Sequence, residues 1–282
     1  MTQIYAETSL LKLHKAYPIE GLENAQPSGL TVLNGELFTI SDKRDTVIYK
    51  LDLEENVARF IKHIRFEPPA AEGILDLEGI TYDDENFYLI SEKQFQILRV
   101  TMADGQCNWA SPGYFGMGKE KGFFGVSNAY FEGICRTAAD RYVLAIERQP
   151  RGLLDVNLSF DAPSTRFVNI DNSKFEFRKN ASYDFSGLDY YKGRVFALQR
   201  NAYAISEMIK TKAGYREGEG WSYKHVATSD TYRYKDMRYG HAEGLAIDDD
   251  YVYIILDNND DERLSDGNDK RPLLFIFHNP GL

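Results

Sequence analysis

The sequence predicts an all-β fold, a five-bladed β-propeller made of four-stranded antiparallel blades. Three observations lead to this prediction: a short phrase recurs along the chain, its copies are evenly spaced, and each copy opens a similar succession of strands and turns. The phrase is a small or acidic residue, then Gly, then Leu or Ile. Its copies are Ser28-Gly29-Leu30, Glu78-Gly79-Ile80, Glu132-Gly133-Ile134, Ser186-Gly187-Leu188 and Glu243-Gly244-Leu245.

The glycines stand at positions 29, 79, 133, 187 and 244, so that successive copies lie 50, 54, 54 and 57 residues apart. Each phrase opens an apolar first strand, and a polar turn follows it. A second strand rich in aromatic or β-branched residues comes next, at 37–40, 87–90, 142–146, 195–198 and 251–255. Third strands are expected at 47–51, 96–100 and 273–277, and a fourth at 59–64. This succession is typical of propeller blades.

The last unit ends after its third strand, close to Leu282. Residues 8–18 have strand-like character and precede the first unit, so we expect them to complete blade five and close the ring. The chain is then a single domain, residues 1–282, with blades that begin near residues 28, 78, 132, 186 and 243. A linear solenoid of the same units is the alternative.

The protein carries a formal net charge of −10, which opposes binding to nucleic acid or to an anionic membrane. No apolar run approaches the roughly 20 residues of a membrane-spanning helix, and the residues after Met1 lack the pattern of a secretory signal. We therefore expect that the protein binds neither nucleic acid nor a membrane, and we expect it to be a monomer. Its expected location is the cytoplasm, or the periplasm or the outside of the cell if a signal peptide has been removed. Cys107 and Cys135 form no C-x-x-C motif, and no disulfide framework is expected.

Acidic residues recur where, in each blade, the first strand starts and the antiparallel second strand ends, which is one mouth of the central channel. Like charges a few Å apart raise one another's pKa values, so a cation among them is expected. Ca²⁺ prefers oxygen ligands. The alternative is that the glutamates accept backbone N–H bonds from the adjoining blade, while arginines neutralise the rest. The paired positions are Ser28 with Asp42, Glu78 with Glu92, Glu132 with Glu147, Ser186 with Gln199, and Glu243 with Asp257. The predicted Ca²⁺ ligands are Glu78, Glu132, Glu243 and Asp257.

Basic residues follow the second strands at Lys43, Lys93, Arg148 and Arg200, and two long loops open onto the same mouth. The loops, residues 109–130 and 229–241, carry aromatic and basic side chains. Above an acidic floor, such side chains suit a small anionic ligand with phosphate or carboxylate groups. The alternative is that the loops are solvated and their aromatic residues pack on the rim of the propeller.

Three segments contain more than the repeat phrase. They are Asp76-Leu77-Glu78-Gly79-Ile80 with Ser91-Glu92, Phe185-Ser186-Gly187-Leu188 with Ala197-Leu198-Gln199-Arg200, and His241-Ala242-Glu243-Gly244-Leu245 with Leu256-Asp257-Asn258-Asn259. These segments resemble the phytase-like β-propeller family, whose domain carries the label "esterase-like activity of phytase". The chain is also similar to a related bacterial propeller family, named for regulation by a quorum-sensing factor, which shares the Glu-Gly repeats. The first resemblance implies phosphoester or ester hydrolysis and Ca²⁺ dependence.

Two functions remain open from the sequence. The first is a metal-assisted hydrolase of phosphate or carboxylic esters, in which a carboxylate acts as general base and arginines clamp the anionic substrate. The second is a propeller that binds a ligand or partner without catalysis and holds any ion for structure alone. The predicted catalytic residues are Glu92, Glu147, Arg148 and Arg200, and the predicted ligand-binding residues are Lys93, His241 and Arg238.

Overall fold

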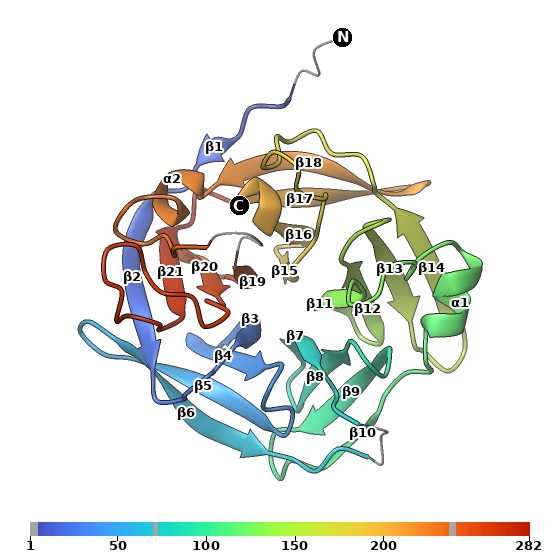
Figure 1. Ribbon diagram of the computed structural model, residues 1–282. Coiled ribbons are helices and arrows are strands. Elements are labelled where there is room, and N and C mark those ends of the chain that lie inside the picture. Colours follow the sequence, from blue (N-terminus) through green and yellow to red (C-terminus); the bar gives the residue numbers. More distant parts are fainter. Residues whose placement is uncertain (1–4, 70–72, 237–240) are drawn as a thin grey trace.

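The sheets of the computed structural model are arranged around a central axis, and the fold is an all-β propeller (Figure 1). The structure describes residues 5–69, 73–236 and 241–282. Within these segments, three sheets are separate and a fourth, longer sheet is continuous. In each separate sheet four consecutive strands pair antiparallel in sequence order, as hairpin-connected strands do.

The three separate sheets have the following strands. The first contains β7 (Leu77–Tyr82), β8 (Asn86–Ser91), β9 (Gln96–Thr101) and β10 (Cys107–Trp109). The second contains β11 (Phe131–Ala138), β12 (Arg141–Ile146), β13 (Gly152–Asn157) and β14 (Ser164–Asn169). The third contains β15 (Gly187–Tyr191), β16 (Arg194–Gln199), β17 (Ala204–Thr211), β18 (Gly214–Ser222) and, outermost, β1 (Ser9–Leu10).

The long sheet consists of two antiparallel groups. One group is β3 (Pro27–Leu33), β4 (Glu36–Ser41), β5 (Val47–Leu53) and β6 (Ala58–Arg65), and the other is β19 (Ala242–Ile247), β20 (Tyr251–Leu256), β21 (Leu273–His278) and β2 (Leu13–Glu20). A short parallel pairing of β2 with β6, at Ile19 with Ala58 and Glu20 with Arg59, joins the groups. The helices are short: α1 (Phe115–Glu120), α2 (Lys224–Ala227) and the 3₁₀ turn η1 (Arg200–Ala202).

The ring closes, because inner strand β19 contacts β3 as well as β15. This contact rules out the linear solenoid. The N-terminal segment divides between two sheets: β2 pairs antiparallel with β21, whereas Ser9 and Leu10 pair in parallel with β18. The expectation that residues 8–18 lie together beside the last unit is therefore wrong for Ser9 and Leu10. Leu11 is fully buried in an apolar cluster between the two sheets, and this contact accounts for the crossing.

The repeat glycines form a tight ring at the waist of the channel. A Cβ atom built on Gly79 would lie 2.8 Å from the Cα atom of Gly133, and one on Gly29 would lie 2.8 Å from the Cα atom of Gly79. A Cβ on Gly244 would lie 2.7 Å from the carbonyl carbon of Gly29. At Gly29, Gly79, Gly133 and Gly244 the inner strands thus approach too closely for a side chain, whereas a Cβ on Gly187 would lie an ordinary 3.4 Å from the Leu245 nitrogen.

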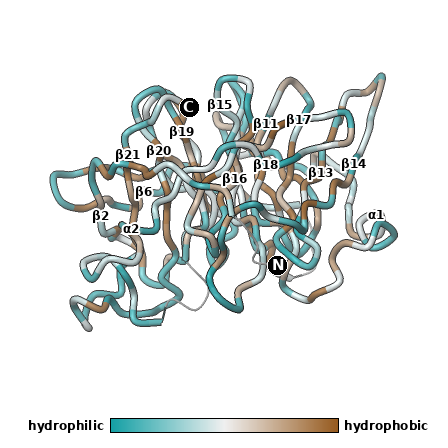
Figure 2. The backbone as a smooth tube through the Cα atoms, turned by 90° about the horizontal axis from the view of Figure 1, so that it is seen from above, coloured by the Kyte–Doolittle hydropathy of each residue, from teal (hydrophilic) through white to brown (hydrophobic). Residues whose placement is uncertain are grey.

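Apolar side chains fill the spaces between neighbouring sheets. Phe38 of β4 packs on Phe87 of β8 with ring centroids 5.2 Å apart, and Tyr88 packs on Tyr142 of the next sheet at 5.1 Å. Hydrophobic residues gather in the strands, while the loops at both faces are largely hydrophilic (Figure 2). Among the described residues, no helix has the length and apolar character needed to cross a bilayer.

Candidate functional site

The mouth where the inner strands begin is hollowed into a cavity of about 390 Å³. We call it the mouth cavity. Antiparallel pairing brings the start of each first strand next to the end of the second strand, so residues distant in sequence meet there. The lining residues are Gln26, Pro27, Ser28, Asp42, Glu78, Asn128, Glu132, Glu147, Arg148, Arg200, Glu243, Asp257 and Asn259.

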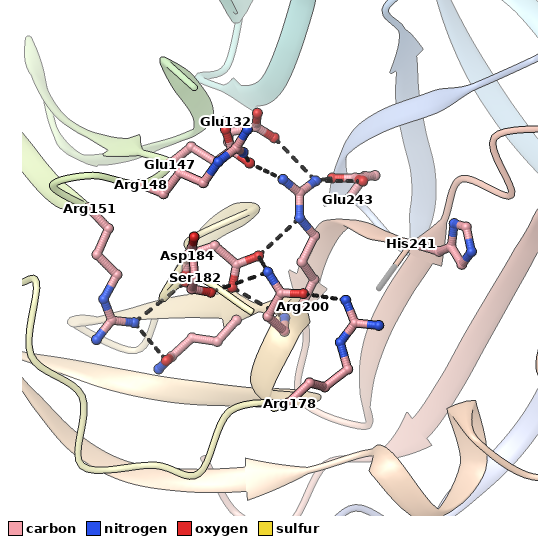
Figure 3. Close-up of polar contacts among 12 residues, drawn as sticks. Glu132, Glu147, Arg148, Arg151, Arg178, Ser182, Asp184, Arg200, His241 and Glu243 are labelled. Carbon is pink, nitrogen blue, oxygen red and sulfur yellow. Dashed lines mark hydrogen bonds and ion pairs between the residues drawn. The ribbon is translucent and has the colours of Figure 1, made fainter. Parts of the chain in front are cut away.

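Arg200 lies at the centre of four carboxylates (Figure 3). Its Nε donates to Asp184 Oδ2 at 3.0 Å, and its Nη1 lies 2.6 Å from Glu243 Oε2 and 3.7 Å from Glu132 Oε2. Its Nη2 pairs with Glu147. Glu132 lies in β11, Glu243 in β19, Glu147 directly follows β12 and Asp184 precedes β15, so the Arg200 side chain, which is 11% exposed, connects carboxylates from separate parts of the ring.

The pKa values of this cluster follow from burial and mutual pairing. Burial raises the pKa values of the Glu132 and Glu243 carboxyls, while the positive charge of Arg200 opposes the shift. Burial alone would lower the pKa of Arg200, but Glu243, Glu132 and Asp184 outweigh it and hold that pKa well above its ordinary value. Arg200 therefore remains charged and is a cation built into the mouth.

A second acidic cluster has no arginine. One carboxylate oxygen from each of Asp42, Asp76 and Glu78 lies within 4.8 Å of the others, and we call these residues the acidic triad. Asp42 pairs with Lys43, and Asp76 lies 2.8 Å from Lys93 Nζ. Glu78 has no hydrogen bond or ion pair with any residue that the structure describes.

The triad has the features of an incompletely neutralised site. Burial raises the pKa of Glu78 well above its usual range, and the charges of Glu132, Asp76 and Asp42 add to the shift. Burial also raises the pKa of Asp42, against the effect of Lys43. Asp42 Oδ1 is buried and lacks a hydrogen-bond partner. An all-oxygen donor set with an unpartnered oxygen fits the ligand preference of Ca²⁺.

Of the four predicted metal ligands, Glu78 belongs to the triad. Glu132 and Glu243 instead pair with Arg200. Asp257, at the end of β20, lines the mouth cavity, and burial raises its pKa to about 7. The charges of Glu243 and Asp42 add to this shift, and the N–H that Asn259 donates to Asp257 Oδ1 at 2.9 Å opposes it.

The predicted catalytic residues divide into two groups. Glu92 is 2% exposed, accepts the Tyr130 N–H at 3.1 Å, pairs with Lys93 at 3.0 Å and does not line the mouth cavity. Glu147, Arg148 and Arg200 do line it. Glu147 pairs with both arginines. The Arg148 side chain is 28% exposed and is the more accessible of the two guanidinium groups.

The predicted ligand-binding residues lie mostly away from the cavity. Lys93 bridges Asp76 and Glu92. His241 is 2% exposed, with Nε2 at 3.2 Å from the Asp236 carbonyl oxygen and its ring edge-on to Tyr234, and burial lowers its pKa. Figure 3 shows it to one side of the Arg200 cluster. Arg238 lies outside the described residues.

The loop aromatics pack on the propeller rather than over the mouth. Phe123 and Phe124 are buried, 3% and 2% exposed, in a cluster with Phe131 of β11. Asn128 is the residue of the 109–130 loop that lines the mouth cavity within the described part of the chain. These contacts favour the alternative in which the aromatic residues of the loops pack on the rim of the propeller.

Two residues of the candidate site, Asp76 and Asp184, were not among those predicted from the sequence. Both stand three residues before a repeat glycine, in Asp76-Leu77-Glu78-Gly79 and Asp184-Phe185-Ser186-Gly187. Asp184 is fully buried and also binds the Asn201 amide at 2.8 Å. The other three copies have Gln26, Tyr130 and His241 at this position, so the repeat gives little signal for the two aspartates, and their partners cannot be read from spacing.

The fold and the site define a β-propeller with a carboxylate-rich mouth. Residues 4–259 match the family described as SdiA-regulated, and the chain belongs to this family. The similarity to the propellers named for a quorum-sensing factor is thereby confirmed. No curated protein sequence matches the chain.

Solved structures share the fold, and two of them match over nearly the whole length of both chains. A PQQ-bound aldose sugar dehydrogenase from Streptomyces coelicolor is 14% identical with a TM-score of 0.54, and the match covers 98% of this chain and 100% of that one. A glutaminyl cyclase from Myxococcus xanthus is 14% identical with a TM-score of 0.58, over 96% of this chain and 98% of that one. At this identity the likeness concerns architecture alone.

Proposed function

We propose that the chain is a single five-bladed propeller, residues 1–282, that acts at its mouth cavity as a metal-assisted hydrolase of phosphate or carboxylic esters. The blade count is supported by the five inner strands that carry the repeat phrase, β3, β7, β11, β15 and β19. The parallel β2–β6 pairing, which spans two residues of each strand, then joins two blades at their outer edges. The observation that carries the proposed activity is the acidic triad, with Glu78 unpaired beside a cavity that also holds Arg148.

Asp42, Asp76 and Glu78 are the residues that would hold Ca²⁺. Each carboxylate offers up to two oxygens, and water or ligand oxygens complete the six to eight that Ca²⁺ takes. When bound, Ca²⁺ supplies positive charge that polarises a phosphoryl or carbonyl oxygen. This assignment keeps Glu78 from the original ligand set and leaves Glu132 and Glu243 as partners of Arg200.

The other residues of the cavity bind and orient the ester, and one carboxylate accepts a proton from the attacking water. Arg148 is exposed enough to contact an anionic group, whereas Arg200 already has four carboxylate partners. Asp257 is better placed than Glu92 as general base, because it lines the cavity and its pKa is about 7. A base with a pKa near the working pH is present in its deprotonated form and still accepts a proton effectively.

Thermal melting tests the metal site. Ca²⁺ at 100 times its dissociation constant should stabilise the metal-free protein by about 2.7 kcal/mol, and Glu78→Gln should abolish the gain. Glu85→Gln, which alters an exposed carboxylate in the turn between β7 and β8, is the matched control and should keep it. A metal-free protein whose melting ignores Ca²⁺ would refute the site.

Turnover tests the reaction. Phosphomonoesters, phosphodiesters and carboxylic esters are screened with Ca²⁺, and for any ester that is hydrolysed Asp257→Asn should lower kcat by about a hundredfold or more. Arg148→Ala should raise KM for anionic esters, since it removes a contact to the substrate. Hydrolysis that neither variant changes would refute these roles.

The second candidate is a propeller that binds a small anionic ligand without catalysis. One observation favours it: Arg200 and Glu92, two of the residues first assigned to catalysis, are fully engaged with protein partners. Ca²⁺-dependent stabilisation without turnover on any ester class would support this candidate over the hydrolase.

A further inference from the structure

A second cavity of about 490 Å³ lies at the opposite end of the channel. We call it the far cavity. The C-terminal parts of the inner strands line it, with Thr31 of β3, Tyr82 of β7, Arg136 of β11, Asp189 of β15 and Ile247 of β19. Its volume falls in the range of small-molecule sites, roughly 300–1,000 Å³.

The waist separates the far cavity from the mouth cavity. The residues that follow the repeat glycines are apolar and at most 4% exposed, and the space among them has no room for a water molecule. A ligand in one cavity therefore cannot reach the other through the channel. The waist residues are Leu30, Ile80, Ile134, Leu188 and Leu245.

Several polar groups of the far cavity have no partner among the residues that the structure describes. The Arg136 side chain makes no hydrogen bond or ion pair with a described residue, and its Nε is buried. Thr31 is 3% exposed, and its hydroxyl has no partner in the described segments. The phenol groups of Tyr82 and Tyr190, both half-buried, are similarly without a hydrogen bond to the described residues. These groups offer both donors and acceptors to a ligand.

The carboxylates of the far cavity accept hydrogen bonds from the protein, and burial raises the pKa of Asp189 to about 7. Asp189 accepts the backbone N–H groups of Tyr190 at 2.8 Å and Ile247 at 2.7 Å. Asp249 accepts the Tyr191 hydroxyl at 2.6 Å and pairs with Lys192 at 2.9 Å. Each retains lone pairs that can accept a hydroxyl hydrogen.

This combination selects among ligand classes. An anion would meet Asp189, Asp248 and Asp249 with Arg136 as the one lining cation that lacks an anionic partner among the described residues. A purely apolar ligand would leave the hydroxyls and the guanidinium unsatisfied. A neutral sugar carries no negative charge and still satisfies the polar groups, because its hydroxyls donate to carboxylates and accept from Arg136. The C–H faces of its ring pack on tyrosine rings. We propose that the far cavity is a second binding site whose ligand is a small neutral saccharide of one or two rings.

The test is binding of glucose, galactose, N-acetylglucosamine, maltose and cellobiose to the full chain, by saturation-transfer NMR and then calorimetry. At least one should bind, and Arg136→Gln and Tyr190→Ala should each weaken it about tenfold or more, since each removes a contact to the ligand. Tyr82→Phe, which keeps the ring and removes the hydroxyl, guards against a folding defect and should weaken binding less. The matched controls Arg99→Gln on β9 and Tyr5→Ala should leave affinity unchanged.

Two outcomes would overturn the proposal. One is that none of these sugars binds, or that binding is indifferent to Arg136→Gln and Tyr190→Ala. The other is that acetate or inorganic phosphate binds in an Arg136-dependent way while the sugars do not, which would mean an anion site. Glu78→Gln, at the other end of the channel, should leave sugar affinity unchanged and thus separates this site from the mouth cavity.

Discussion

Replacing Arg200 with glutamine tests whether this residue is a structural cation. The substitution keeps a polar side chain of moderate length but removes the charge that faces Asp184, Glu132, Glu147 and Glu243. Removing one partner of a buried ion pair costs about 3–5 kcal/mol, because the remaining charge is left uncompensated. With four carboxylates affected, we expect a loss of about 4 kcal/mol at pH 8. For a domain of this size that corresponds to a fall in Tm of roughly 8–16 °C.

The loss should depend on pH, and its sign follows from the carboxylate pKa values. Burial already raises the pKa values of Glu132 and Glu243 in the folded protein, and Arg200 opposes the rise. Without Arg200 these folded-state values rise further. A carboxyl whose folded-state pKa exceeds its unfolded value favours the fold below the unfolded pKa and loses that contribution as pH rises through the folded pKa. The deficit of the variant should therefore be small near pH 5 and largest near pH 8.

Urea unfolding at pH 5 and pH 8 measures both quantities. The matched control is Arg59→Gln, since exposed Arg59 also pairs with two carboxylates, Glu54 at 2.8 Å and Glu20 at 3.1 Å. Exposed ion pairs contribute little, so the control should unfold close to the unaltered protein at both pH values. A structural role for the Arg200 charge is refuted if Arg200→Gln unfolds like Arg59→Gln at pH 8, or if its loss of stability is equal at pH 5 and pH 8.

Three further predictions concern the waist, the triad and the buried histidine. Gly79→Ala would place a methyl group 2.8 Å from the Cα atom of Gly133 and should lower the free energy of unfolding in urea by about 2 kcal/mol. Its control, Gly116→Ala in α1, has nothing within 4 Å of the new methyl group and should be neutral or slightly stabilising. Equal effects of the two substitutions would count against the close packing at the waist. Ca²⁺ affinity measured by calorimetry should increase from pH 6 to pH 8, because burial raises the pKa of Glu78 and this group must deprotonate to bind; a pH-independent affinity would exclude Glu78 as a ligand. His241→Phe should leave the hydrolysis rate of any ester substrate unchanged, since His241 is packed against the protein outside the mouth cavity, and a hundredfold loss in a folded variant would return it to the active site.

Much of the fold could be predicted because strand pairing within each unit is local in sequence. The second strands expected at 87–90 and 142–146 appear as β8 and β12, each paired with the strand that the repeat phrase opens. The N-terminal segment was harder. Ser9 and Leu10 pair with β18, more than 200 residues away, and apolar character alone does not say which of two neighbouring sheets a short strand joins.

The candidate site could be predicted as a place but not as a set of partners. Repeat spacing located the acidic mouth, and it singled out Glu78, Glu132 and Glu243 as equivalent positions. The structure makes them unequal: Glu132 and Glu243 face Arg200, whereas Glu78 faces Asp42 and Asp76. The difference arises because Arg200 reaches from η1 toward one side of the channel.

The repeat by itself predicted the inner strands and their arrangement in a ring, because each copy opens the same succession of strands and turns. That four of the five repeat glycines leave no room for a side chain was shown only by the structure. Which carboxylates are neutralised, and which are left to hold an ion, was decided only by the tertiary structure. Electrostatic energy depends on distance and burial in space, and the charges around Arg200 come from strands that are far apart along the chain.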